Sequence, residues 1–396
     1  MRLEEYVTCF PKPHGVTGFH GLMQWHWRPT QAARKVRMAK KLQIQQRGRV
    51  VQVQHSSSVL KDNPLGDPAD RTVNVYLPHA YDQPRARNRR FITLYDMVGY
   101  TGSGPSHTNW KNFEENVPEQ LDRLIAEGKM PPVIVVFADC FTALGGNQYI
   151  NSSAIGRYAD YLTREIVPFV DGDFRTRAER DHRGCFGKSS GGYGAMIHGM
   201  KYAKYWGAIA NHSGDAYFDF VYRAEWPAVL TYLQAFISGN APGPAKSAKP
   251  GYDDGRIKRF LEDVWGRNQL NGTDVMTLMM ICMAATYDPD PKAPLGFRVP
   301  FDLYTGEFLE SRWKRWLKHD PVELVNTYAA ELKSLRGIFI DCGWRDQYHI
   351  HFGSRQLSAA LKKRKIKHTY AEFNDTHSGI DYRMDTSLPF LARALR

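Results

Sequence analysis

Short apolar runs bounded by turn residues recur along the chain from about residue 50 onward. They have the length and the β-branched or aromatic content of strands. Stretches with the helical spacing of apolar residues lie between several of them. The predicted strands are 50–55, 72–77, 91–95, 132–138, 183–187, 206–210, 336–341 and 367–373, and the predicted helices are 113–127, 155–168, 191–203 and 353–364.

This alternation predicts an α/β fold with a mostly parallel central sheet flanked by helices. No helical stretch separates the first two strands, so that end of the sheet is expected to be antiparallel. Residues 214–335 break the rhythm and contain four tryptophans. We expect them to form a mostly helical cap insertion, with the core made of residues 50–213 and 336–396.

Composition narrows the class of protein. The 396 residues are 42% hydrophobic and 24% charged, which is ordinary for a globular protein. No apolar run reaches 18 residues, so no membrane association is expected. The five cysteines are scattered and form no CxxC pair, which argues against a disulfide framework or a structural zinc site. A cytoplasmic location is therefore expected.

Positive charge is concentrated at the start of the chain. The net charge is +12, and residues 1–50 hold ten lysines and arginines against two glutamates. Because the remainder carries little excess charge, binding of nucleic acid across the fold is not expected. We interpret residues 1–49 as a basic, poorly ordered N-terminal extension. A targeting, membrane-binding or RNA-binding arm is the alternative.

The strongest local motif is Gly187-Lys188-Ser189-Ser190-Gly191, a G-x-S-x-G pattern. A short apolar strand runs into it and a helix rich in small residues follows. Strand, sharp turn and helix are the context of a nucleophile elbow, in which the serine adopts a strained backbone and its neighbours must be small. A phosphate-binding P-loop is disfavoured because His182 stands where that motif needs a glycine. A glycine turn used only for packing is the remaining alternative.

A nucleophilic serine needs a base and an orienting carboxylate, which follow it in the order acid, then histidine, in elbow-type folds. Asp346 comes in a loop just after the strand at 336–341, and His377 lies in a polar loop after the last strand. Ser189, Asp346 and His377 are therefore the predicted catalytic residues. Asp341, at the strand end, is the main rival of Asp346.

Backbone N–H groups are expected to bind the developing oxyanion. The first donor is predicted to be Ser190, at the start of the elbow helix. The second is expected from the glycine-rich loop after the third core strand. Tyr100 is the first choice there, and Met97 or Val98 the second.

At this point the chain resembles the serine-esterase branch of the α/β-hydrolases, which includes esterase D (S-formylglutathione hydrolase), enterochelin esterases, feruloyl esterases and mycolyltransferases. The resemblance covers about residues 55–395. It is carried by Asn63–Pro68 and Val75–Pro78, by Gly145–Tyr149, by Gly191-Gly192-Tyr193-Gly194-Ala195, by Gly343–Tyr348 and by His377-Ser378. It implies that Ser189 is the nucleophile, His377 the base and Asp346 the residue that orients it.

Two positions depart from that family. Val98-Gly99 stands where the family often has His-Gly, and Lys188 replaces the histidine frequent before the nucleophile. The residues predict a serine carboxylic-ester hydrolase that acts on a small-molecule ester through an acyl-enzyme, with no cofactor and no metal. An acyltransferase with the same triad and a catalytically silent scaffold that serves as a binding protein are the alternatives. The oligomeric state is not predicted.

The insertion contains a methionine cluster at residues 276, 279, 280 and 283. One interpretation is a lid whose side chains line the substrate pocket. The other is an ordinary core helix, because methionine is a common filler of irregular cores.

Overall fold

The structure is a computed structural model that describes residues 46–237 and 249–396. The predicted basic extension over residues 1–49 lies almost wholly outside the described residues.

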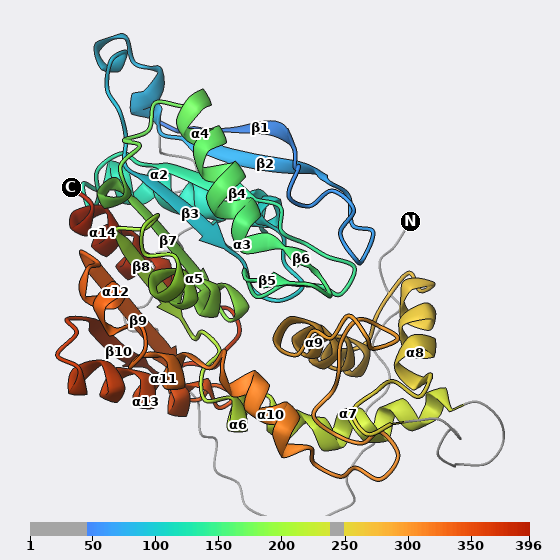
Figure 1. The fold of residues 1–396 in the computed structure, drawn as a ribbon. Helices are drawn as coiled ribbons and strands as arrows, with labels where there is room; N and C mark the ends of the chain where they lie inside the picture. Colours follow the sequence, from blue (N-terminus) through green and yellow to red (C-terminus); the bar gives the residue numbers. More distant parts are fainter. Residues whose placement is uncertain (1–45, 238–248) are drawn as a thin grey trace, which may run out of the picture. The chain divides into compact units, whose positions relative to one another are not determined.

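An eight-stranded sheet forms the centre, with the strand order β1-β2-β4-β3-β7-β8-β9-β10 (Figure 1). All neighbours from β4 to β10 pair in parallel. β2 pairs antiparallel with both β1 and β4, which confirms the predicted antiparallel end. The strands are β1 (Arg49–Ser56), β2 (Asp70–Leu77), β3 (Thr93–Met97), β4 (Ile134–Ala138), β7 (Arg183–Lys188), β8 (Ala208–His212), β9 (Gly337–Gly343) and β10 (Thr369–Phe373); β5 (Asn151–Ser152) and β6 (Gly156–Arg157) form a separate two-stranded sheet.

Helices cover both faces of the sheet because the central strands are apolar on both faces. In β4, Val135 and Phe137 join the hydrophobic cluster under α2 and α14, whereas Ile134 and Val136 join the larger cluster on the other face. Such continuous apolar strands are typical of buried parallel sheets. The helices of the core are α2 (Val117–Ala126), α3 (Tyr158–Asp160), α4 (Val167–Asp173), α5 (Ser190–Lys201), α13 (Ile350–Lys363) and α14 (Met384–Ala394), with a π-helical turn η4 (Tyr161–Ile166) between α3 and α4.

Between β8 and β9 the described residues form helices and loops. They are α6 (Phe218–Val221), α7 (Trp226–Leu233), α8 (Arg256–Trp265), α9 (Gly272–Tyr287), α10 (Glu310–Leu317), α11 (Pro321–Leu324) and α12 (Ala329–Lys333). The described residues also contain short 3-10 turns: η1 (His79–Asp82), η2 (Pro84–Ala86), η3 (Gly104–Thr108), η5 (Arg180–His182), η6 (Arg223–Glu225), η7 (Gln234–Phe236) and η8 (Asp381–Arg383). None of the helices among the described residues combines the length and apolar character needed to cross a bilayer.

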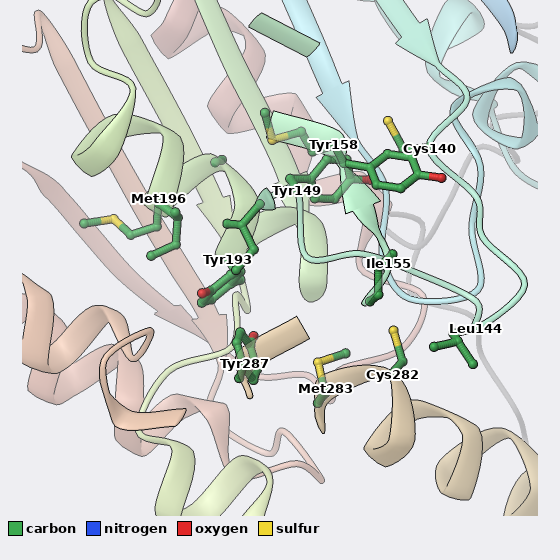
Figure 2. Close-up of a cluster of buried hydrophobic side chains, with 14 of the residues drawn as sticks. Cys140, Leu144, Tyr149, Ile155, Tyr158, Tyr193, Met196, Cys282, Met283 and Tyr287 are labelled. Carbon is green, nitrogen blue, oxygen red and sulfur yellow. The ribbon is translucent and has the colours of Figure 1, made fainter. Parts of the chain in front are cut away.

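Helix α9 attaches this segment to the core. Figure 2 shows Cys282 and Met283 directed from α9 toward Leu144 and Ile155. Tyr287, at the end of the same helix, meets Tyr193 of α5 edge to face at 5.9 Å between ring centroids. The aromatic contact holds the end of α9 against α5, and the sulfur-bearing side chains pack against the segment that contains Leu144 and Ile155.

Candidate active site

Ser189 occupies the sharp turn between β7 and α5. Its φ of 58° and ψ of −127° lie in a region that non-glycine residues rarely adopt. Its N–H donates to the carbonyl of His212 at 3.0 Å, and its carbonyl accepts from the N–H of Tyr193 at 2.9 Å. Such strain costs on the order of 1–3 kcal/mol and persists only where the surroundings fix it. The local geometry is that of a nucleophile elbow.

Glycines make this turn sterically feasible. A Cβ atom at Gly187 or Gly191 would overlap the carbonyl oxygen of Met97 in β3. β3 and the elbow therefore lie so close together that only glycine, which has no Cβ atom, fits at positions 187 and 191.

Gly191→Ala is expected to lower the free energy of unfolding by about 3 kcal/mol or more, because the elbow or β3 must shift to relieve the overlap. Urea unfolding followed by circular dichroism measures the effect. Gly172→Ala in α4 is the matched control, since nothing lies within 4 Å of its added Cβ. It should be neutral or stabilise by about 0.5–1 kcal/mol. An unchanged urea midpoint for Gly191→Ala would contradict the close approach.

His377 and Asp346 form a buried pair. The Nδ1 atom of His377 lies 2.7 Å from Oδ2 of Asp346. Oδ1 of Asp346 accepts the N–H of Tyr348 at 2.9 Å, and the N–H of His377 donates to Oε1 of Gln347 at 3.0 Å. With an ionised Asp346 as acceptor, Nδ1 carries the proton and Nε2 keeps its lone pair.

The rival carboxylate has other partners. Asp341 lies inside β9, where Oδ1 is 2.5 Å from Nδ1 of His212 and Oδ2 accepts from Nε of Arg383 at 2.9 Å. Nε2 of His212 in turn contacts the hydroxyl of Ser387 at 2.7 Å. The structure therefore brings Asp346, and not Asp341, to His377.

Ser189 and His377 both line a cleft of about 540 Å³. The cleft lies where the strands β3, β7, β8 and β9 end, which is the usual ligand-binding edge of an open parallel sheet. Its lining includes Val98, Gly99, Tyr100, Lys188, Ser190, Asp215, Tyr222, Leu270, Val275, Met276, Met279, Tyr348 and Asp381.

The loop after β3 lies directly against the serine. A Cβ at Gly99 would be 3.5 Å from Cβ of Ser189. The hydroxyl of Tyr149 donates to the carbonyl of Val98 at 2.8 Å, and the hydroxyl of Tyr100 donates to the carbonyl of Leu144 at 2.8 Å. These bonds fix the loop beside the elbow.

Some backbone N–H groups of this loop donate hydrogen bonds within the protein. Those of Thr101 and Gly102 donate to the carbonyls of Gly145 and Gly99, at 2.9 and 3.0 Å. Met97 is paired with Gly187 in the sheet. The N–H groups of Val98, Gly99 and Tyr100 lie between these two segments, so the predicted donor Tyr100 and the second choice Val98 both remain candidates.

The methionine cluster is divided between the cleft and the core. Met280 and Met283 are fully buried in the core, whereas Met276 and Met279 line the cleft. The spacing of three and four places all four on one face of α9, so the pair nearer the start of the helix meets the cleft and the next pair meets the core.

A buried polar network next to Ser189 was not predicted. Oδ2 of Asp215 accepts from the hydroxyl of Tyr222 at 2.6 Å and from Nε2 of Gln148 at 3.0 Å. Nε2 of Gln148 also lies 2.8 Å from the hydroxyl of Tyr287. Burial raises the pKa of Asp215, and the hydrogen bonds from Tyr222 and Gln148 offset part of that rise. The available sequence signal was the position of Asp215 in the loop after β8.

A second histidine–aspartate pair at the cleft was also missed. Nδ1 of His107, in η3, is 2.5 Å from Oδ2 of Asp96 in β3, and His107 lines the cleft. His198, in contrast, is a packing residue of α5, bonded to the carbonyl of Tyr149 and to the indole of Trp206. Burial lowers the pKa of His198 to about 4, so it is neutral at physiological pH.

Comparison with solved structures identifies the fold. A ferulic acid esterase superposes with a TM-score of 0.55 over 88% of this chain and 99% of that one, at 17% identity. An S-formylglutathione hydrolase from Agrobacterium tumefaciens superposes with a TM-score of 0.50 over 88% and 96%, also at 17% identity. At this identity the likeness establishes the α/β-hydrolase fold, and the predicted fold class is confirmed.

The family follows from the sequence of the same region. The family model described as "Putative esterase" matches residues 68–385, so the chain belongs to this esterase family. The predicted resemblance to serine esterases of the α/β-hydrolase type is thereby confirmed.

Curated relatives agree over shorter spans. An "Endo-1,4-beta-xylanase/feruloyl esterase" from Xylanibacter ruminicola is 30% identical over 151 residues, which are 37% of this chain and 20% of that protein. An esterase from Mycobacterium tuberculosis is 27% identical over 227 residues, which are 55% of this chain and 43% of that protein. The chain thus spans less than half the length of these relatives.

Proposed function

We propose that the protein is a serine carboxylic-ester hydrolase in which Ser189 is the nucleophile, His377 the general base and Asp346 the residue that orients the imidazole. The observation that carries the proposal is a strained serine at a strand–helix turn, in the same cleft as a histidine held by a buried carboxylate. Membership of the esterase family supports ester hydrolysis as the reaction.

In the proposed mechanism, Nε2 of His377 removes the proton of Ser189 as the Oγ atom attacks the ester carbonyl. The N–H groups of Ser190 and Tyr100 stabilise the oxyanion of the tetrahedral intermediate. His377 then donates its proton to the departing alcohol, which leaves an acyl-enzyme. Water attacks the acyl-enzyme with the roles of His377 reversed, and Asp346 stabilises the imidazolium at each step.

The apolar part of the cleft suits an acyl chain. Leu270, Val275, Met276 and Met279 line it on the α9 side. Flexible methionines adapt to acyl groups of different shape. The segment between β8 and β9 thus acts as a cap that shapes the acyl pocket.

Hydrolysis of 4-nitrophenyl acetate, butyrate and octanoate by the purified protein tests the function. We expect turnover of at least one ester and stoichiometric labelling by a serine-directed fluorophosphonate. Methyl ferulate belongs in the panel because a relative is named as a feruloyl esterase. Absence of both turnover and labelling would favour the silent-scaffold alternative.

An acyltransferase with the same triad differs only in the acceptor that clears the acyl-enzyme. Product analysis with added short alcohols separates the two reactions. A hydrolase should release mainly free acid, whereas a transferase should form mainly the new ester at modest alcohol concentrations.

A further inference from the structure

The Asp96–His107 pair places a cation at the cleft. The side chain of Asp96 has 0% exposure and that of His107 has 18%. Oδ1 of Asp96 is buried and has no hydrogen-bond partner among the described residues. A buried carboxylate with one unbonded oxygen is stabilised by a positive partner, which favours the protonated form of His107.

The titration of His107 agrees with this assignment. Burial by itself lowers the pKa of His107, but the charge and hydrogen bond of Asp96, with the charge of Asp381, raise it above its usual value. In the protonated ring both nitrogens are donors. Because Nδ1 is engaged by Asp96, Nε2–H is the donor that His107 offers to the cleft it lines.

Lys188 adds a second cation to the same edge. It ends β7 immediately before the nucleophile and lines the cleft. Within residues 46–237 and 249–396, no carboxylate forms an ion pair with Lys188. The neighbouring carboxylate Asp381 already pairs with Nζ of Lys111 at 2.7 Å.

The charges at this edge do not cancel. Asp96 is matched by His107, and Asp381 is matched by Lys111. Among the described residues Lys188 remains without a carboxylate in an ion pair, in a partly buried position, because Asp215, the other carboxylate of the lining, is bonded to Tyr222 and Gln148. A cleft lined by such unmatched charge attracts and orients an anion.

His107 and Lys188 are placed on the side of the cleft where the alcohol part of the ester would lie. In the proposed mechanism the leaving oxygen must lie next to His377, which protonates it. Asp381 follows His377 by four residues, and the charges of both Lys188 and His107 act on Asp381. The acyl chain is assigned to the apolar α9 side, so the cationic edge faces the departing alcohol.

We propose that His107 and Lys188 form a subsite that binds an anionic group, such as a carboxylate, on the alcohol part of the substrate. Nε2–H of His107 and Nζ of Lys188 donate charge-assisted hydrogen bonds to that group, and Asp96 positions the His107 ring. The inference rests on the proposed ester hydrolysis and specifies its substrate class.

The test compares two esters that differ in charge and hardly in size. They are 3-carboxy-4-nitrophenyl butyrate and its neutral 3-carbamoyl analogue, each corrected for its rate of alkaline hydrolysis. We expect the wild-type protein to prefer the carboxylate at least about ten-fold in kcat/KM, equivalent to about 1.4 kcal/mol. Lys188→Gln and His107→Gln should each reduce this ratio about five-fold or more.

Lys129→Gln is the charge-matched control. Lys129 is exposed, pairs with Glu127 at 2.8 Å and does not belong to the cleft lining. This variant should keep the wild-type ratio. A variant that simply misfolds lowers both esters equally, so the ratio separates anion recognition from a structural effect.

Three results would overturn the inference. The first is a wild-type ratio of one or less, and the second is an unchanged ratio in Lys188→Gln and His107→Gln proteins that circular dichroism shows to be folded. The third is a preference for 4-nitrophenyl hemiglutarate over 4-nitrophenyl pentanoate that exceeds the preference on the alcohol side, which would assign the anion to the acyl group.

Failure of the proposed function gives a different pattern. It would abolish hydrolysis of both esters and fluorophosphonate labelling together. Slowing of that labelling by 5-hydroxy-2-nitrobenzoate, but not by its amide, provides the same comparison without turnover. Equal slowing by both compounds would count against the subsite.

Discussion

Ser189→Ala is expected to lower kcat/KM for 4-nitrophenyl butyrate by on the order of 10⁴–10⁶-fold, because the variant has no oxygen to form the proposed acyl-enzyme. The fold should persist, since the alanine methyl group is smaller than the side chain it replaces and the N–H bond to His212 is a backbone bond. Steady-state rates and mass spectrometry after fluorophosphonate treatment measure the outcome. Labelling should disappear from the variant.

The neighbouring serine provides the matched control. Ser190→Ala keeps the backbone N–H proposed for the oxyanion and removes only an Oγ that lies 3.5 Å from Asp215. We expect it to retain labelling and to stay within about ten-fold of the wild-type rate. If labelling were lost in Ser190→Ala and kept in Ser189→Ala, the nucleophile would be Ser190 and the proposed assignment to Ser189 would be wrong.

Local sequence patterns predicted most strands of the sheet, because a buried strand is a continuous run of apolar residues. Strand boundaries are misplaced where an apolar residue next to the strand makes a different tertiary contact. The strand expected at 206–210 is β8, Ala208–His212, because Trp206 belongs to the preceding turn and donates its indole N–H to His198. From the sequence alone, an apolar residue that precedes a strand is assigned to that strand, because the tertiary contact that the residue makes is not known.

Helix ends show the same limit. The helix expected over 113–127 is α2, Val117–Ala126, and it begins at a capping box between Asn116 and Glu119. Helix α14 was not predicted, because Pro389 interrupts a pattern that otherwise has helical spacing.

The candidate site could be proposed from the sequence where residue spacing along the chain defines the motif. Ser189 stands in a contiguous motif, and the acid and histidine follow in a fixed order. Asp341 and Asp346 could not be separated from sequence, because the extent of β9 to Gly343 decides which carboxylate lies within the strand. The Asp96–His107 and Asp215–Gln148 pairs join separate elements, so only the folded structure reveals them.

Asp346→Asn is expected to reduce kcat by about 10⁴-fold with little loss of stability. Oδ1 of the asparagine can still accept the N–H of Tyr348, so the loop retains its bond. Its amide N–H₂, however, takes the place of Oδ2 and donates toward Nδ1 of His377. The proton then shifts to Nε2, which loses the lone pair that accepts the proton of Ser189 in the proposed mechanism.

Asp341→Asn separates this effect from a general loss of structure. Asp341 accepts from both His212 and Arg383 in a fully buried position, so its replacement should lower the unfolding temperature. The folded fraction should nevertheless keep kcat within about ten-fold of wild type. Nitrogen NMR of the His377 ring reports the tautomer directly. If Asp346→Asn leaves the proton on Nδ1, or costs less than ten-fold in kcat, Asp346 does not orient the base and the proposed triad is wrong.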